Sequence, residues 1–488
     1  MDRELPGRST TALTIALALC LAAVCALYLR RAFDRQLVEF AEGPILTVAE
    51  RIERQPISAH WTDEAPYTLS AYGPGYFDCV VLAKKFWLGS TDLVLGRMVA
   101  LLALLATAGM IGVSVRRRTG STEQALLGAV AYVVSPALIY WAPALRVDTL
   151  VAFFSCAAYL VVGPERKSLL VSAALVAVGS LVKPTAALTA VPIFLYLLLN
   201  QRRQDARLYA VAVCVLGSLA WWITNHSSDG YFWIVAVRNN VSRMLVTNGL
   251  RSLGSLLLAP FSWLCLAIIA QQVKERGMAT AARSLFCLSF IVSLLISTVL
   301  VCREGSHINY FLETCALGSV LIGLFAIPPD APATNHRRRL AISFFFVAIV
   351  VPSLIVLLVW PGAFVRQTAA DQLAVKQVLE EAPSDCQVLA DGEWVPSVLD
   401  AGRLPLVNDP YMLRVLAERK LLSMEPIIEL LDSGRVCYLI LDRPIDDHRH
   451  PEPGRWPAEV LDAMERSFVP IVQRDGLWIY RHEKPARR

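Results

Sequence analysis

Charged residues are scarce in this sequence. Asp, Glu, Lys and Arg together make up 18% of its 488 residues, whereas soluble domains contain about 25%. Hydrophobic residues make up 55%, and the mean hydropathy is +0.50. This composition excludes a disordered chain and argues against one large soluble enzyme. The apolar excess is typical of many membrane helices with a soluble part attached.

Metal-binding signatures are also lacking. The eleven cysteines lie mostly inside apolar runs, where packing between helices explains them. Only Cys386 and Cys437 lie in the C-terminal region, and no CxxC or Cys/His spacing predicts a metal site. The sequence has no internal repeats. Its net charge of +5 is explained by basic loops between the apolar runs, so it does not call for a nucleic-acid partner.

Long apolar runs dominate the first three quarters of the chain. A helix needs about 20 mostly apolar residues to cross a bilayer. Such runs lie at about 11–29, 92–114, 123–141, 147–163, 168–182, 185–199, 207–224, 253–271, 284–302, 309–327 and 340–360. They predict a polytopic α-helical membrane protein with about eleven transmembrane helices. The first run lacks a small-residue cleavage site, so we expect a retained helix and not a removed signal peptide.

Basic residues in short loops predict the orientation, because such loops lie on the cytoplasmic side. With a cytoplasmic N-terminus, all five basic clusters between later spans fall on that side: Arg116–Arg118, Arg166-Lys167, Arg202-Arg203 with Arg207, Lys274-Arg276 with Arg283, and Arg337–Arg339. Arg30, Arg31 and Arg35 after the first span favour the reverse, and we let the five clusters outvote them. Segments 30–91, 142–147, 225–252, 303–308 and everything after about 361 are then expected on the outer face.

Two outer-face regions are long enough to fold. The loop 30–91 has an approximate helical stripe of apolar residues interrupted at Gly43-Pro44, which predicts an amphipathic helix at the membrane interface. The stretch 75–90, with its two lysines, predicts a second one. Residues 366–488 predict a small soluble α/β domain, with strands near 387–390 and 437–441, helices at 370–381 and 411–432, and a hairpin around Asp475-Gly476. The domain boundary is thus expected between a membrane module, 1–365, and this domain, 366–488.

Charged and polar side chains at the ends of the spans are costly there, and they mark candidate functional positions. In the predicted topology they share the outer half: Glu42, Arg146, Asp148, Lys183, Arg303, Glu304, His307 and Glu313. Their convergence from separate stretches of chain predicts a site on that face.

Three of these positions have a specific chemistry. Glu42 can accept a proton from a hydroxyl as a general base, or it can be a favourable charge near the helix that begins at Pro44. Asp148 is either functional or an ordinary helix N-cap paired with Arg146. Lys183 precedes Pro184, so an ammonium beside a helix N-terminus favours a phosphate. The alternative for Lys183 is a lysine that extends to the interface.

Two further stretches are candidate pocket residues. Asn309 and Glu313 are four residues apart and share a helix face, and burying Glu313 without a partner would be expensive. Asn239 and Asn240 lie in a basic, amide-rich loop that suits sugar hydroxyls or phosphate, and equally suits a solvated loop.

In order along the chain, these motifs resemble those of the GT-C glycosyltransferases, in particular the bacterial protein-mannosyltransferase-like (RgtA/B/C/D-like) branch. The stretches that carry the resemblance are Ala41-Glu42-Gly43-Pro44, Tyr72-Gly73-Pro74-Gly75-Tyr76, Gly96-Arg97, Arg116 to Gly120, Leu145 to Leu150, Val182 to Ala186 and Asn309 to Glu313. The resemblance covers about residues 10–365, and many members also carry a soluble outer domain.

The resemblance implies a hexosyl- or pentosyltransferase that uses a polyprenyl-phosphate-linked donor on the periplasmic or outer face of the inner membrane, with a glycan, lipid or protein as acceptor. Glu42 maps to the expected base, although the family usually has Asp there, and Asp148 maps to a second acidic position. The remaining site residues follow from the same mapping. Lys183, Arg146 and Arg303 are assigned to the donor phosphate, and Tyr72, Asn239, Asn240, His307, Asn309, Tyr310 and Glu313 to the acceptor or sugar pocket. The resemblance names no certain cofactor and leaves the use of a divalent metal, held by Glu42 with Asp148, open.

Other classes of membrane protein share some of these features. A lipid-linked-sugar flippase or transporter would also have many spans and buried charges, but it more often shows duplicated halves with broken helices. A non-catalytic scaffold would have no functional need for Glu42. The long outer loop and the C-terminal domain favour the transferase over a simple carrier.

Overall fold

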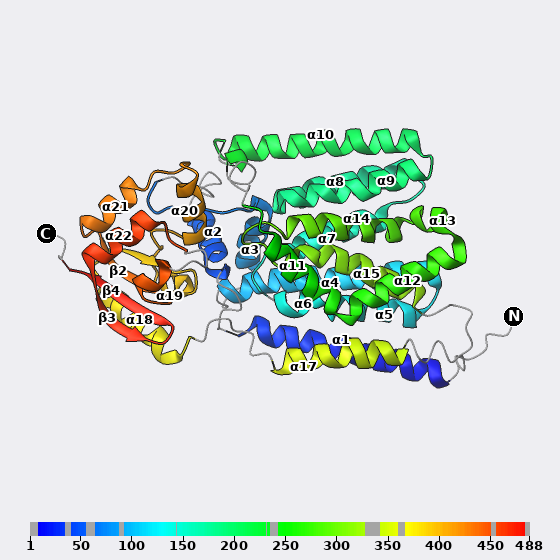
Figure 1. The fold of residues 1–488 in the computed structure, drawn as a ribbon, viewed down its shortest axis with the longest axis horizontal. Helices are drawn as coiled ribbons and strands as arrows, with labels where there is room; N and C mark the ends of the chain where they lie inside the picture. Colours follow the sequence, from blue (N-terminus) through cyan, green and yellow to red (C-terminus); the bar gives the residue numbers. More distant parts are fainter. Residues whose placement is uncertain are drawn as a thin grey trace.

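The computed structural model describes residues 8–34, 41–54, 64–86, 92–142, 144–230, 232–234, 243–326, 342–359, 367–449 and 455–483. It has a body of long helices at one end and an α/β domain at the other, with two short helices of the first outer loop between them (Figure 1).

The helical body contains α1 (Arg8–Ala32), α4 (Asp92–Thr119), α5 (Thr122–Val133), α6 (Pro136–Trp141), α7 (Asp148–Val161), α8 (Arg166–Val182), η2 (Pro184–Thr189), α9 (Ala190–Leu199), α10 (Arg203–Ser227), α11 (Val246–Leu258), α12 (Pro260–Arg276), α13 (Met278–Ala282), α14 (Leu285–Leu300), η4 (Ile308–Phe311), α15 (Leu312–Phe325), η5 (Phe345–Val350) and α17 (Val351–Val359). One large apolar core joins many of these helices.

The predicted number of membrane crossings is only partly supported. Within the described residues, five helices are long and apolar enough to span a membrane, and the pair α11–α12, bent by 74°, makes a sixth candidate. The predicted runs at 147–163, 185–199 and 284–302 fall on shorter apolar helices. The run at 123–141 is broken between α5 and α6, where Pro136 begins a new helix. The count of about eleven therefore stays a prediction.

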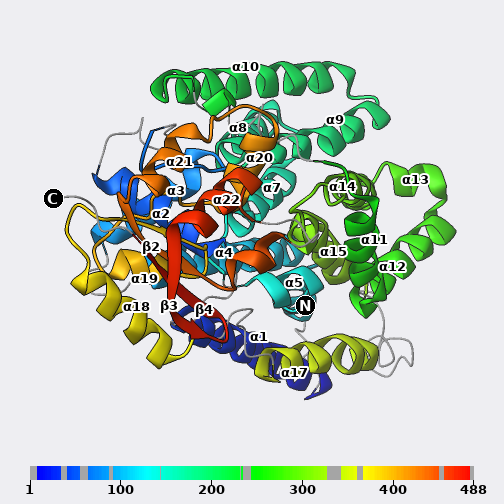
Figure 2. The same cartoon turned by 60° about the vertical axis from the view of Figure 1, so that its left-hand side comes forward.

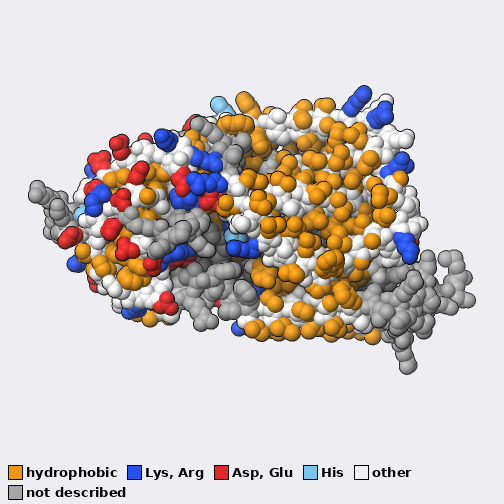
Figure 3. All heavy atoms as spheres, viewed as in Figure 1, with side chains coloured by type: hydrophobic (Ala, Val, Ile, Leu, Met, Phe, Trp, Pro, Cys, Tyr) orange, Lys and Arg blue, Asp and Glu red, His pale blue; other side chains and the backbone are white. Residues whose placement is uncertain are grey.

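The surface of the helical body is largely apolar. Figure 3 shows hydrophobic side chains spread over the helices, while charged side chains gather on the α/β domain and at the opposite end of the body. Long apolar side chains on α10, including Val211, Leu219 and Trp222, are more than half exposed. A surface of this kind is stable in lipid and would aggregate in water, so the body has the character of a membrane domain.

The predicted C-terminal α/β domain is present. It comprises α18 (Ala369–Glu381), β1 (Gln387–Ala390), α19 (Val395–Asp400), α20 (Pro410–Glu418), α21 (Glu425–Asp432), β2 (Val436–Leu441), η6 (Ile445–Arg449), α22 (Ala458–Ser467), β3 (Phe468–Arg474) and β4 (Leu477–His482). The strand order is β1-β2-β4-β3, with β1 and β2 parallel and the other pairs antiparallel. Both predicted strands and the hairpin at Asp475-Gly476 are confirmed.

The sheet has helices on both of its faces (Figure 2), and a small core lies under each set of helices. Helices α18 and α19 pack on one face, and α20, α21 and α22 pack on the other. The single helix expected over 411–432 is two helices, because Lys420 adopts a φ of +56°, which an α-helix does not accommodate.

The segment between α1 and α4, which the sequence predicts to be the first outer loop, packs between the helical body and this domain. It forms α2 (Glu42–Arg54) and α3 (Pro74–Phe86), which correspond to the two predicted interfacial helices. Between them, Tyr67 pairs with Val407 as an isolated parallel bridge. Asn408 receives a hydrogen bond from the Leu69 amide at 2.6 Å and donates to the Leu69 carbonyl at 2.9 Å and to the Pro44 carbonyl at 3.3 Å.

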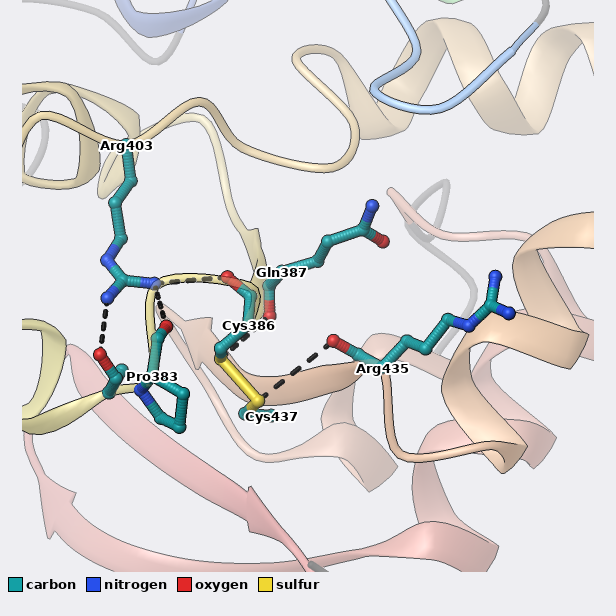
Figure 4. Close-up of a disulfide and its surroundings, with 7 residues drawn as sticks. Pro383, Cys386, Gln387, Arg403, Arg435 and Cys437 are labelled. Atoms are coloured by element: carbon teal, nitrogen blue, oxygen red, sulfur yellow. Dashed lines mark hydrogen bonds between the residues drawn. A yellow bond between two sulfur atoms is a disulfide. The ribbon is translucent and has the colours of Figure 1, made fainter. Parts of the chain in front are cut away.

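A disulfide joins Cys386 and Cys437, the two cysteines of the C-terminal region (Figure 4). It links the residue before β1 to the second residue of β2, so it fixes the start of the parallel pair. Arg403 donates hydrogen bonds to the carbonyls of Ala382, Pro383 and Cys386 beside it.

Candidate functional site

A cavity lies where the helical body, the first outer loop and the C-terminal domain meet. We call it the junction cavity. It encloses about 130 Å³. Five predicted site residues line it: Tyr72, Arg146, Lys183, Arg303 and Tyr310. The C-terminal domain contributes Asp409, Tyr411, Met412 and Val415 from the start of α20.

Cations and aromatic rings share one wall of the junction cavity. The Lys183 ammonium lies over the Tyr310 ring, 4.0 Å from its centre, and 5.7 Å from that of Tyr72. The Arg146 guanidinium lies 4.9 Å from the centre of the Trp141 ring. Aromatic faces hold a cation in place without neutralising it, so this wall keeps its positive charge for an anionic group.

Asp148 balances part of that charge. Its carboxylate accepts a hydrogen bond from Lys183 Nζ at 2.8 Å, and its other oxygen lies 3.4 Å from Arg146 Nε. Asp148 is only 6% exposed and Lys183 only 5%. Helix α8 ends at Val182 and η2 begins at Pro184. This break places Lys183 beside Asp148, the first residue of α7.

A second cavity extends from the same residues into the helical body, and we call it the intramembrane cavity. It encloses about 50 Å³ and shares Lys183 and Tyr310 with the junction cavity. Its polar lining includes Asp148, Asn309 and Glu313, and its apolar lining includes Leu188, Ile296 and Leu300.

The predicted pair Asn309 and Glu313 lies on this second cavity. The Glu313 carboxylate accepts hydrogen bonds from Tyr159 at 2.7 Å and Thr189 at 2.8 Å. These bonds provide the partners that a carboxylate at this depth requires. The side-chain oxygen of Asn309 is buried without a hydrogen-bond partner among the described residues, so it is available to a ligand hydroxyl.

Glu42 lies behind the wall of the junction cavity. Its two carboxylate oxygens receive hydrogen bonds from Nε and Nη2 of Arg97, both at 2.8 Å, and the Leu145 amide donates to it at 2.7 Å. Glu42 and Arg97 are both fully buried. Its neighbours Ala41 and Pro44 line the cavity instead. Glu42 therefore acts on the site indirectly. It holds the backbone at Leu145, and the next residue, Arg146, lines the cavity.

Three of the other predicted residues are not seen to line a cavity. His307 is exposed and packs against Trp141, with ring centres 5.8 Å apart, and it is not among the residues that line either cavity. Asn239 and Asn240 lie outside the described residues.

Asp409 is a cavity residue that the sequence reading missed. It caps α20 by accepting a hydrogen bond from the Met412 amide at 3.1 Å. Burial raises the pKa of its carboxyl to about 6. The Asn408-Asp409-Pro410 sequence is a recognisable helix start, but nothing local shows that this start faces a cavity more than 220 residues from Lys183 in sequence.

The metal site considered for Glu42 with Asp148 does not suit the geometry. The Glu42 carboxylate faces Arg97, and Asp148 faces Lys183 and Arg146, so cationic side chains occupy the positions that a metal would need. Among the described residues, the acidic and histidine side chains that gather at metal-ligand spacing lie in the C-terminal domain.

Comparison with known proteins gives a short sequence match and long structural ones. Residues 86–226 match the family model described as dolichyl-phosphate-mannose-protein mannosyltransferase. No curated protein matches the chain significantly.

The structural matches extend over almost the whole chain. ArnT from Cupriavidus metallidurans, in a crystal structure bound to undecaprenyl phosphate, has a TM-score of 0.65 at 12% identity, covering 96% of this chain and 98% of ArnT. The Archaeoglobus fulgidus oligosaccharyltransferase has a TM-score of 0.59 at 12% identity, covering 97% and 74%. The mycobacterial arabinofuranosyltransferase AftD has a TM-score of 0.53 at 16% identity, covering 96% and 40%.

These matches include the C-terminal domain and the helical body together, and all three proteins are GT-C glycosyltransferases. The chain therefore has the GT-C fold that its sequence motifs predicted.

Proposed function

We propose that this chain is a membrane glycosyltransferase that moves a sugar from a polyprenyl-phosphate-linked donor to a hydroxyl of a cell-envelope acceptor. The observation that carries the proposal is the position of Lys183, in the common wall of the junction cavity and the intramembrane cavity. A lipid-linked donor needs both environments, because its phosphate and sugar are polar and its tail belongs in the membrane.

The donor phosphate is assigned to Lys183, Arg146 and Arg303. All three line the junction cavity, and positive groups at a leaving phosphate stabilise the charge that develops as the glycosidic bond breaks. The ArnT structure with undecaprenyl phosphate supports this assignment by analogy of fold. The apolar side of the intramembrane cavity, with Leu188 and Leu300, suits the first units of the lipid.

The acceptor and sugar are assigned to the remaining cavity residues. Tyr72 and Tyr310 present aromatic faces to the junction cavity, and Asn309 and Glu313 present polar atoms to the intramembrane cavity. Aromatic faces and amide or carboxylate groups together match the apolar faces and hydroxyls of a sugar.

Asp148 is our candidate for the general base, and Glu42 for a residue that positions the wall. Asp148 lines a cavity and Glu42 does not. The Glu42 carboxylate is engaged by Arg97 and by the Leu145 amide, so it orders the backbone that carries Arg146. Asp409 is the rival base, because a carboxylate with a pKa near 6 accepts protons efficiently at neutral pH.

The site is proposed to face the outside of the inner membrane. The disulfide in the C-terminal domain supports this orientation, because disulfides persist in oxidising compartments such as the periplasm. The Lys and Arg side chains at the far end of the helical body (Figure 3) support a cytoplasmic location for that end.

The transfer reaction can be tested directly. Purified protein in lipid vesicles is incubated with radiolabelled polyprenyl-phosphate sugars and with envelope fractions from a deletion strain. We expect incorporation of label into an acceptor by the wild type, and a loss of about 100- to 10,000-fold in Asp148→Asn, the usual range for removal of a general base. Movement of lipid-linked sugar across the vesicles with no transfer from any donor would overturn the proposal in favour of a flippase.

A pH profile separates the two carboxylates. Asp148 is held between cations and stays ionised, so kcat/KM should remain level between about pH 5 and pH 7 if it is the base. If Asp409 is the base, kcat/KM falls as the pH drops through about 6 and its carboxyl takes up a proton. Asp409→Asn keeps a side chain that caps helices well. A loss of activity in that variant, with activity retained in Asp148→Asn, would reassign the base.

A further inference from the structure

A second group of buried ionisable side chains lies in the C-terminal domain, outside the set of residues that line the two cavities. Strands β1 and β2 are parallel, with Ala390 opposite Ile440. Asp391 directly follows β1 and Asp442 directly follows β2. Because parallel strands end at the same edge of a sheet, the two carboxylates meet there. His448 of η6 closes over them and is only 2% exposed.

The distances within this group fit a shared ion better than direct hydrogen bonds. His448 Nε2 lies 3.5 Å from Asp391 Oδ2 and 3.6 Å from Asp442 Oδ1. Hydrogen bonds from nitrogen to oxygen are about 2.7–3.2 Å long. Two ligands of a tetrahedral ion with bonds near 2.1 Å are about 3.4 Å apart, which is close to the spacing observed.

The imidazole of His448 is directed at the two carboxylates. Neither nitrogen of His448 makes a hydrogen bond within the part of the chain that the structure describes. A buried imidazole that is aimed at two carboxylates and bonded to neither is an independent sign of a missing ligand.

The group holds more negative than positive charge. Asp391, Asp442 and Glu393 bring three carboxylates together, while Arg455 contacts Glu393 and Asp442, and the more exposed Arg443 contacts Asp442 at 3.3 Å. Two guanidinium groups do not balance three carboxylates, and a bound cation would supply the missing positive charge. Trp456 Nε1 and the Asp442 amide donate to Asp391 at 2.8 and 2.9 Å, and these bonds fix the orientation of its carboxylate, as outer contacts do for metal ligands.

We propose that Asp391, Asp442 and His448 bind a divalent transition-metal ion of the Zn²⁺ type, which clamps the carboxyl edge of the sheet to η6. One imidazole nitrogen with two carboxylate oxygens suits Zn²⁺, whereas Ca²⁺ and Mg²⁺ prefer sites made only of oxygen. Asp442 is partly exposed, with 16% of its side chain accessible, so an ion can enter from solvent and a water can complete the coordination. The site is separate from the proposed transfer reaction and does not depend on it.

The test uses the full-length protein without a polyhistidine tag, stripped with a chelator and dialysed against ZnCl₂. We expect one tightly bound zinc per chain by elemental analysis, and a rise in the thermal midpoint that EDTA reverses. His448→Gln and Asp442→Asn should each lose the bound zinc and the rise in thermal midpoint that zinc causes. His482→Gln is the matched control, because this histidine is also buried in the C-terminal domain, against the Phe468 ring, and it should keep both.

The results distinguish the proposal from its rivals. The nine free cysteines of the chain are unchanged in every variant, so zinc bound to thiols would persist in His448→Gln and would overturn the assignment. A rise in midpoint with CaCl₂ or MgCl₂ that does not need His448 would overturn the nitrogen-ligated site.

Burial and the neighbouring Asp442 charge raise the pKa of Asp391. If the stripped wild type binds none of these metals, a proton shared by the two aspartates occupies the place of the ion and the proposal fails. If His448→Gln does not fold, the proposal is decided by whether the wild type and His482→Gln each bind one zinc ion that EDTA removes.

Discussion

Glu42 and Arg97 form a bidentate ion pair with no exposure to solvent. A carboxylate in this setting is held in place by its partner, and its energy depends on that partner more than on any substrate. Asp148 differs because it faces a cavity as well as its cations. The sequence motifs mark both acids as candidate catalytic residues. At the scale of single residues, the structure distinguishes them, because Asp148 lines a cavity and Glu42 does not.

Removal of the Glu42 charge should destabilise the protein strongly. Glu42→Gln leaves the Arg97 guanidinium buried without its counter-charge, and we expect a loss of about 3–5 kcal/mol in the free energy of unfolding, measured by thermal or denaturant unfolding in detergent. Glu50→Gln on the same helix is the control. Lys84 then keeps Glu53 as a partner and the pair is more exposed, so the loss should be under about 1 kcal/mol. Equal losses in the two variants would show that the Glu42–Arg97 pair is not specially buried.

At the scale of elements, proline and turn residues decide where the helices break. Pro136 and Pro260 begin α6 and α12, and α11 and α12 meet at an angle of 74°. Arg31 illustrates the same point. Its guanidinium donates to the carbonyls of Ile139 and Leu357, which lie in the last turns of α6 and α17. This local role explains an arginine that disagreed with the basic-loop rule.

The disulfide should stabilise the C-terminal sheet. It closes a loop of 51 residues between β1 and β2, and such a crosslink typically contributes about 2–4 kcal/mol by restricting the unfolded chain. We expect Cys386→Ala/Cys437→Ala to lower the midpoint of thermal unfolding, followed by tryptophan fluorescence. Dithiothreitol should lower the wild-type midpoint and leave the double variant unchanged. Cys214→Ser removes an exposed free thiol and should have no effect. A reductant effect that persists in the double variant would contradict the assignment.

At the scale of the whole molecule, the C-terminal domain forms part of the cavity wall. Its α20 docks on the loop that follows α14, where Arg414 binds Glu304 at 2.6 Å, and its segment before α20 pairs with the first outer loop. The junction cavity exists because these three parts meet. The domain is therefore expected to affect substrate binding as well as stability.

Asn408 is the residue that tests this docking. It is fully buried and makes hydrogen bonds with Leu69 and Pro44 of the outer loop. Asn408→Ala leaves backbone groups without partners, at about 1–3 kcal/mol for each buried group. We expect faster limited proteolysis between the domains and a KM raised at least severalfold, with a smaller change in kcat. Asn200→Ala at the opposite end of the helical body also removes a side chain bonded to backbone carbonyls and should leave KM unchanged. Unchanged KM in Asn408→Ala would show that docking does not shape the cavity.

The sequence by itself determined the fold class, the two short helices between the first two apolar runs, the strands at 387–390 and 437–441 and the convergence of charges on one end. These features follow from hydrophobic periodicity, turn chemistry and the cost of charge in a membrane, all of which act locally along the chain. The motifs around Lys183 and Asn309 predicted residues that the structure places on cavities.

Only the tertiary structure decided which of those residues have access to a ligand. The partner of Glu42 is Arg97, 55 residues away, and the wall opposite Lys183 comes from Asp409 and Tyr411 of another domain. The group Asp391, Asp442 and His448 likewise depends on which strands are neighbours in the sheet. Pairings across such separations are set by packing, and packing depends on the whole chain at once, so no local pattern encodes them.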